Sequence, residues 1–410
     1  MTELRRSLGL GDAVAVGLSA MVGAGVFAAF APAAAAAGSA LVVGLAVAAL
    51  IAYCNASSSA RLAVRYPQSG GTYVYGRERL GPFWGHLAGW SFVVGKTASC
   101  AAMALTVGAY AWPQYAHAVA VGTVVALTAL NVFGVQRSAT VARVVVALVL
   151  AVLAVVVVAA LTSSAADPGR LFDGASGGFF GVLQAAGLLF FAFAGYARIA
   201  TLGEEVADPE RTLPRAIFLA LAGTLVVYLA VGVALLAVLG PGGVAGSAAP
   251  LADAARASGW AGLAPVVRVA ACVAAVGSLL ALILGVSRTT LAMARDGHLP
   301  RALAEVDERR KVPVRAEIAV GAVVAVAAAS ADLRYAIGFS SFAVLVYYAV
   351  ANASAWTLDG ALRSRIVPAV GLAGCLLVAL SLPTRSVAVG MLVLAAGALA
   401  YAVTRERGGA

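Results

Sequence analysis

The sequence has little charge and no long polar stretch. Only 11% of its 410 residues are charged, whereas 62% are hydrophobic and the mean hydropathy is +0.96. Soluble domains carry about 25% charged residues, and their surface grows too fast relative to their volume to hide so much apolar area. The longest polar interruption covers only residues 294–315. These shortages exclude an ordinary soluble protein and predict an all-α integral membrane protein in a lipid bilayer.

Cysteine is scarce as well. The chain has Cys54, Cys100, Cys272 and Cys375, which all lie in apolar runs and lack a CxxC partner. This pattern excludes a disulfide framework or a cysteine metal centre, so we expect buried thiols, no cofactor and no metal ion. The net charge is +10, but the basic residues recur in short loops instead of forming one patch. A nucleic-acid partner is therefore not expected.

Groups that carry out catalysis are few. The three histidines, His86, His117 and His298, are scattered near the ends of apolar runs, and no pair of carboxylates lies in the middle of one. We therefore expect no enzymatic activity. The chain shows no P-loop, so ATP-driven transport would need a separate subunit. It also shows no signalling domain and no long tail, which a receptor or sensor would be expected to have. A membrane-embedded amino-acid sensor remains the alternative from a different functional class.

Apolar runs between charged or Gly/Pro breaks predict twelve membrane spans. They cover residues 12–36, 39–60, 85–111, 115–135, 141–163, 179–203, 214–240, 262–293, 313–330, 335–357, 366–382 and 386–404. With twelve spans, most basic loop residues fall on one side, and few fall on the other: Arg170, Arg256, Arg268, Arg334 and Arg385. Positive loops face the cytoplasm. The pattern predicts a multi-pass protein of a bacterial-type plasma (inner) membrane with both termini in the cytoplasm.

Two of the predicted spans contain glycine in the middle. The first contains Gly23-Ala24-Gly25, and the sixth contains glycine beside aromatic residues in Phe191–Tyr196. Carriers use broken helices at equivalent positions of two halves, because the exposed N–H and C=O groups bind a ligand at membrane depth. A helix N-terminus suits a carboxylate and free carbonyls suit an ammonium, which together describe an α-amino acid. The alternatives are a small-residue packing surface in the first span and an aromatic core cluster in the sixth.

Four motifs in order resemble the amino acid–polyamine–organocation superfamily of permeases, in its amino-acid permease branch. They are GAGVF at 23–27, YPQSGGTYVYGRERLGPFWGHLAGW at 66–90, FFAFAGYARIATLGEEVADPERTLPRAI at 190–217 and SRTTLAMARDGHLPRALAEV at 287–306. The resemblance implies alternating access around a midplane site in one transporter domain. It also implies a five-plus-five inverted repeat with discontinuous helices one and six, over 12–163 and 179–357, with two added C-terminal helices in 366–404.

The resemblance also implies a substrate site. Gly23, Ala24 and Gly25 would meet the substrate carboxylate, and Phe191 would be an aromatic gate. The backbone carbonyls expected to meet the amino group lie near Ala20, Met21, Phe191 and Ala194, and the same site includes Gly195 and Tyr196. At the inner end, Glu204, Glu205, Asp208, Arg211, Arg295 and Asp296 are either solvated loop charges or an ion-pair latch on the gate. Arg198 is expected to act structurally at that gate.

Coupling is where this chain departs from the family pattern. Val149 stands where many proton-coupled members have a lysine, and Ser278 is the one hydroxyl near the depth of a sodium site. Lys96 lies in the middle of the third span, where a charge costs at least about 2.5 kcal/mol. It either carries a transported proton or pairs with an anionic group of the substrate. The alternative is a lysine that bonds to carbonyls and holds helices together.

The sequence therefore predicts a secondary active amino-acid transporter that is proton-linked or an exchanger. Its partners would be a small-molecule amino acid, a coupling proton and the lipid bilayer. A transporter of polyamines or other amines with the same fold is the alternative within the same class.

Overall fold

The computed structural model describes residues 9–66, 70–134, 139–174, 176–196, 199, 206, 208–307, 312–358 and 363–408. These residues form helices and no extended strand. The N-terminal half contains α1 (Leu10–Met21), α2 (Ala24–Ala28), α3 (Phe30–Ala37), η1 (Gly38–Ala40), α4 (Leu41–Arg65), α5 (Thr72–Leu80), α6 (Pro82–Ala111), η2 (Pro113–Tyr115), α7 (Ala116–Val132), α8 (Ala139–Leu161) and η3 (Pro168–Leu171).

The C-terminal half is also helical in its described part. It contains α9 (Gly178–Phe193), η4 (Ala194–Tyr196), α11 (Pro209–Gly246), α12 (Pro250–Ala257), α13 (Leu263–Arg295), η5 (Arg301–Ala304), α14 (Val314–Ser330), α15 (Leu333–Trp356), α16 (Arg363–Ser381) and α17 (Thr384–Gly408). In the described residues, 11 helical segments are long and apolar enough to cross a membrane. The prediction of a multi-pass all-α membrane protein is therefore confirmed.

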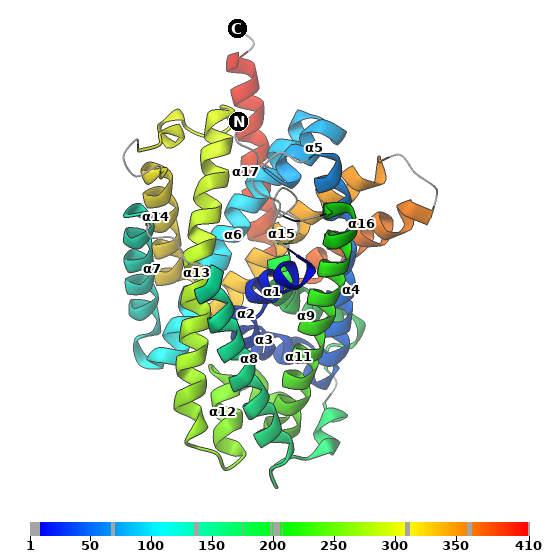
Figure 1. The fold of residues 1–410 in the computed structure, drawn as a ribbon, viewed down its shortest axis with the longest axis vertical. Helices are drawn as coiled ribbons and strands as arrows, with labels where there is room; N and C mark the ends of the chain where they lie inside the picture. Colours follow the sequence, from blue (N-terminus) through cyan, green and yellow to red (C-terminus); the bar gives the residue numbers. More distant parts are fainter. Residues whose placement is uncertain are drawn as a thin grey trace.

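Two short helices were not predicted from the sequence. The helices α5 and α12 lie in segments expected to be loops. In Figure 1, α5 and the C-terminal end of α17 lie at one end of the molecule, and α12 lies at the other. The first span, expected over 12–36, is interrupted at Val22 and Gly23, where its glycines predicted a break, and it continues as α2 and α3. The helix α14 has 17 residues and is about 25 Å long, slightly less than the hydrocarbon core.

The broken helices lie in the middle of the bundle. Figure 1 shows α1, α2 and α9 near its centre, with longer helices around them. Side chains of α2 and of the C-terminal half of α9 are almost entirely buried, as Phe27 and Phe193 show. Peripheral helices instead expose apolar residues, such as Val144 on α8 at 63% and Leu399 on α17 at 67%. Because apolar side chains lose nothing by facing lipid, the outer surface fits a bilayer and the centre holds the polar backbone of the breaks.

The break in the first span has a local cause. The helix ends at Met21, and Val22 and Gly23 leave helical geometry, with φ −78° and ψ 66° at Val22 and φ −121° and ψ −141° at Gly23. Glycine loses the most conformational entropy in a helix, so two glycines within three residues weaken it here. The helix restarts at Ala24. The backbone groups on both sides of Gly23 thus lie at the centre of the protein.

Candidate functional site

The two predicted breaks contact each other directly. A methyl group added to Gly195 would overlap the carbonyl of Ala20 and lie 2.8 Å from the Met21 nitrogen. One added to Gly25 would lie 2.5 Å from the Cα of Ala192. Each glycine therefore removes a side chain where one broken helix crosses the other, and the backbones approach as no other residue would permit. The structure brings together Ala20, Met21, Gly25 and Gly195, four residues of the predicted site, and their role in substrate binding stays a prediction.

Tyr228 on α11 joins the two breaks, and the sequence did not identify it. Its hydroxyl lies 2.7 Å from the Met21 carbonyl oxygen and 3.1 Å from that of Ala192. The side chain is fully buried, with its ring edge-on to Phe30 and Phe193 at 6.4 Å and 5.2 Å between centroids. Because Met21 is one of the carbonyls predicted to meet the substrate amino group, Tyr228 lies at the candidate site. A lone tyrosine in an apolar run carried no signal of this role.

Lys96 lies against the same site. Its Nζ donates to the Ala194 carbonyl at 3.4 Å, and the side chain is 7% exposed. None of the ion pairs within the described residues involves Lys96. The contact is the one expected for a lysine that bonds carbonyls and holds helices together. It also places the amine at a carbonyl predicted to meet the substrate, so the site roles of Lys96 stay predictions.

Around Gly23 and Ala24, the neighbours come from α13 and α6. A methyl group on Gly23 would overlap the Ser278 hydroxyl, and Ala24 packs in a small cluster with Val107 and Ala275. The structure thus places Ser278 beside the first break, as expected for an eighth-span hydroxyl. Coupling to sodium through this hydroxyl stays a prediction. Val149, where a coupling lysine was looked for, is completely buried.

Two aromatic residues of the predicted site, Phe191 and Tyr196, are both buried but pack against different neighbours. Phe191 is 7% exposed and lies in the main hydrophobic core. Tyr196 is fully buried and its ring packs on that of Tyr348 of α15 at 5.2 Å between centroids. The ring of Phe190 also packs edge-on against Tyr348. Tyr196 therefore takes part in the aromatic cluster that the sequence left open as an alternative, next to the glycine that contacts α1.

A cluster of four residues, Tyr73, Arg77, Asp296 and His298, lies at the end of the molecule that carries α5. The Tyr73 hydroxyl lies 2.5 Å from Asp296 Oδ2 and 2.9 Å from His298 Nδ1, and Arg77 Nη1 lies 3.4 Å from Asp296 Oδ2. Burial and the carboxylate raise the pKa of Tyr73, so its hydroxyl stays protonated. Burial lowers the pKa of His298. Asp296 is therefore held by α5, a contact that the motif at 66–90 did not reveal, and its role as a latch stays a prediction.

Of the other residues predicted at the inner gate, some lie outside the described residues and two form an exposed ion pair. Arg198 and Glu204, like Glu205, lie outside the described residues. Asp208 and Arg211 pair with each other at 3.8 Å within one turn of α11, and both side chains are exposed. This pair fits the solvated loop charge that was one of the two expectations.

A buried carboxylate was missed near the same end. Glu317, in the first turns of α14, is completely buried, and Ser287 of α13 donates to its Oε1 at 2.7 Å. The other oxygen has no hydrogen-bond partner in the described part of the chain. The sequence carried no signal for this carboxylate, because Glu317 lies only four residues into the predicted ninth span.

The family model and the relatives that match this chain are all described as permeases or transporters. A family model described as amino acid permease matches residues 8–403. An uncharacterized transporter of Mycobacterium tuberculosis is 68% identical over 98% of this chain and 92% of its own length. The branched-chain amino acid permease BcaP of Bacillus subtilis is 25% identical over 76% of this chain and 72% of its own. The vacuolar cationic amino acid transporter 4 of Arabidopsis thaliana is 29% identical over 81% of this chain and 59% of its own.

Proposed function

This chain belongs to the amino acid permease family, and from that membership we propose that it is a secondary active transporter of amino acids. The supporting observation is the backbone contact between the two broken helices, Gly195 on Ala20 and Gly25 on Ala192. Such contacts at bilayer depth occur where polar backbone lines a binding site. The substrate carboxylate would meet the N-terminus of α2 at Gly23, Ala24 and Gly25.

Two of the carbonyls proposed for the substrate amino group, those of Met21 and Ala194, already have side-chain donors within the protein. Tyr228 donates to the Met21 carbonyl and Lys96 donates to the Ala194 carbonyl. An ammonium group bound there would compete with these donors, since each carbonyl oxygen accepts few hydrogen bonds. We propose that substrate binding displaces Lys96 from Ala194. Displacement frees the amine either to exchange a proton or to meet an anionic group on the substrate.

The architecture proposed for this function follows the family. Twelve helices, counting α14, would form a five-plus-five inverted repeat with two added C-terminal helices. The end that carries α5 and the latch between Tyr73, Arg77 and Asp296 would face the cytoplasm, with both termini on that side of the plasma membrane. Phe191 and the latch would open alternately. Coupling would be to a proton or to a counter-transported substrate.

Counterflow in proteoliposomes tests the proposal. Vesicles loaded with one unlabelled amino acid should accumulate the labelled form of that amino acid from outside. A panel that includes branched-chain, cationic and acidic amino acids, together with polyamines, separates the substrate classes. Empty liposomes are the control. If an amino acid raises the melting temperature of the purified protein but exchanges at the rate of empty liposomes, the protein is a sensor and the transport proposal is wrong.

A further inference from the structure

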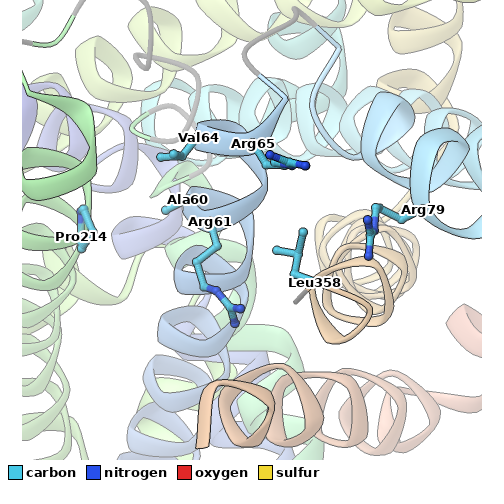
Figure 2. A pocket seen from close by; sticks show the side chains of 7 residues that line it. All are labelled: Ala60, Arg61, Val64, Arg65, Arg79, Pro214 and Leu358. Carbon is cyan, nitrogen blue, oxygen red and sulfur yellow. The ribbon is translucent and has the colours of Figure 1, made fainter. Parts of the chain in front are cut away.

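A cavity opens at the end of α4, beside the latch end of the molecule. Its volume is about 450 Å³, and its walls come from α4, α5, the start of α11 and Leu358, two residues after the end of α15. Figure 2 shows Arg61 and Arg65 on α4 and Arg79 on α5 around Leu358. The remaining lining residues are Ala60, Val64 and Pro214. The cavity thus combines three guanidinium groups with an apolar wall.

The three arginines have no acidic partner among the described residues. Arg61 donates to the Ser364 carbonyl at 2.6 Å, and Arg79 donates to Thr357 Oγ1 at 2.9 Å, so both bind neutral oxygens. None of the ion pairs in the described ranges includes any of the three. Arg61 and Arg65 are also four residues apart on one helix face, where like charges repel. The cluster is therefore complementary to an anion, and the guanidinium geometry favours phosphate.

An exposed apolar strip leads from the cavity toward the middle of the membrane. On α4, Leu50 and Tyr53 lie on the same face as Arg61 and are 55% and 39% exposed. Leu50 is about 16 Å deeper along the helix than Arg61. Phe218, one turn into α11 from Pro214, is 57% exposed and contacts the ring of Tyr53 at 6.4 Å. The strip extends from the cavity along both helices, and its apolar surface could pack against an acyl chain.

We propose that this cavity binds the phosphate headgroup of an anionic membrane phospholipid, whose acyl chain lies along Leu50, Tyr53 and Phe218. A charged rim at the end of a span with an apolar strip below it matches the headgroup and tail of a lipid. Because the cavity touches α4, α5, α11 and Leu358 just after α15, a bound lipid would stabilise the end of the molecule that holds the latch. This inference does not depend on the transported substrate.

Lipid binding by the purified full-length chain tests the proposal. We expect phosphatidylglycerol to raise the melting temperature and to appear as a bound adduct in native mass spectrometry, whereas phosphatidylcholine should do neither. Arg65→Gln is the main variant, because Arg65 is exposed and makes no hydrogen bond or ion pair in the described part of the protein, so folding should be retained. The variant should bind phosphatidylglycerol about fivefold more weakly.

Two controls separate the possible outcomes. Arg301→Gln removes another exposed arginine, on η5, and should leave lipid binding unchanged. Inorganic phosphate tests whether a soluble anion is enough: if it reproduces the stabilisation by phosphatidylglycerol, a free phosphate ligand is favoured and the lipid proposal is overturned. Equal phosphatidylglycerol binding by the parent protein, Arg65→Gln and Arg61→Gln would also overturn it.

Discussion

The Tyr73 hydroxyl donates a hydrogen bond to Asp296 Oδ2 at 2.5 Å, although 223 residues separate them in the chain. Tyr73 belongs to α5 and Asp296 follows α13, so the bond ties the short helix after α4 to the end of a long span. Arg77, one turn along α5, adds an ion pair to the same carboxylate oxygen. Two polar contacts therefore tie α5 to the end of α13.

Removing the Tyr73 hydroxyl should loosen this contact. We expect Tyr73→Phe to destabilise the folded protein by about 1–2 kcal/mol, because a hydrogen bond to a charged carboxylate is lost while the buried ring remains. The melting temperature of the purified protein measures this loss. Tyr115→Phe is the control, since Tyr115 is 59% exposed and its contact is a ring contact with Trp112. Equal melting temperatures for both variants would show that the Tyr73–Asp296 bond adds no stability.

Stability at this end should also depend on pH. Burial lowers the pKa of His298 below its ordinary value near 6.5, an effect that Arg77 reinforces and Asp296 opposes. A histidine with a lowered folded-state pKa binds fewer protons when folded than when unfolded. Its contribution to stability is therefore complete above pH 6.5 and is lost as the pH falls toward the folded-state value. We expect the melting temperature to fall below pH 6.5 and His298→Gln to flatten that fall.

The sequence predicted the spans well because burial in lipid needs long apolar runs. The starts of α6, α13 and α14 differ from the predicted starts by one to three residues. The helices α5 and α12 were missed since each is short and carries charged residues. The break at Gly23 was predicted because glycine leaves a local mark on a helix. No local mark identifies Tyr228 or Glu317, whose roles depend on residues far away in the chain.

Glu317 depends on a hydrogen bond from another helix. Ser287→Ala removes the donor to Glu317 Oε1 and leaves a buried carboxyl group without it. We expect a loss of about 1–3 kcal/mol in stability, the cost of an unsatisfied buried polar group. Ser330→Ala is a suitable control, because Ser330 is exposed and donates only to its own helix. A melting temperature for Ser287→Ala that matches the control would contradict this account.

Tyr228→Phe tests the bridge between the breaks. The change keeps the aromatic packing with Phe30 and Phe193 but removes the donor to the Met21 and Ala192 carbonyls. We expect counterflow to fall at least tenfold while the protein still folds, because the two broken helices lose their shared tether. Uptake at the rate of the parent protein would place Tyr228 outside the transport cycle.

Lys96→Ala separates the two proposed roles of this lysine. If Lys96 carries the proton, a pH gradient should no longer drive uptake, whereas counterflow should persist. If Lys96 meets an anionic group of the substrate, the order of preferred substrates should change and pH-driven uptake of the new substrate should remain. Unchanged selectivity and unchanged pH-driven uptake would rule out both roles and leave the bond to the Ala194 carbonyl as a purely structural contact.

The strongest expectation concerns the glycines where the broken helices cross. In Gly25→Ala the new Cβ would lie 2.5 Å from the Cα of Ala192, and in Gly195→Ala it would overlap the Ala20 carbonyl. Backbone atoms of packed helices do not yield as a flexible side chain does, so each methyl group must push the two breaks apart. We expect either substitution to reduce counterflow at least tenfold. Gly122→Ala in α7 is the matched control, since its methyl group would meet nothing within 4 Å. If Gly25→Ala transports as well as Gly122→Ala, close contact between the broken helices is not required for transport.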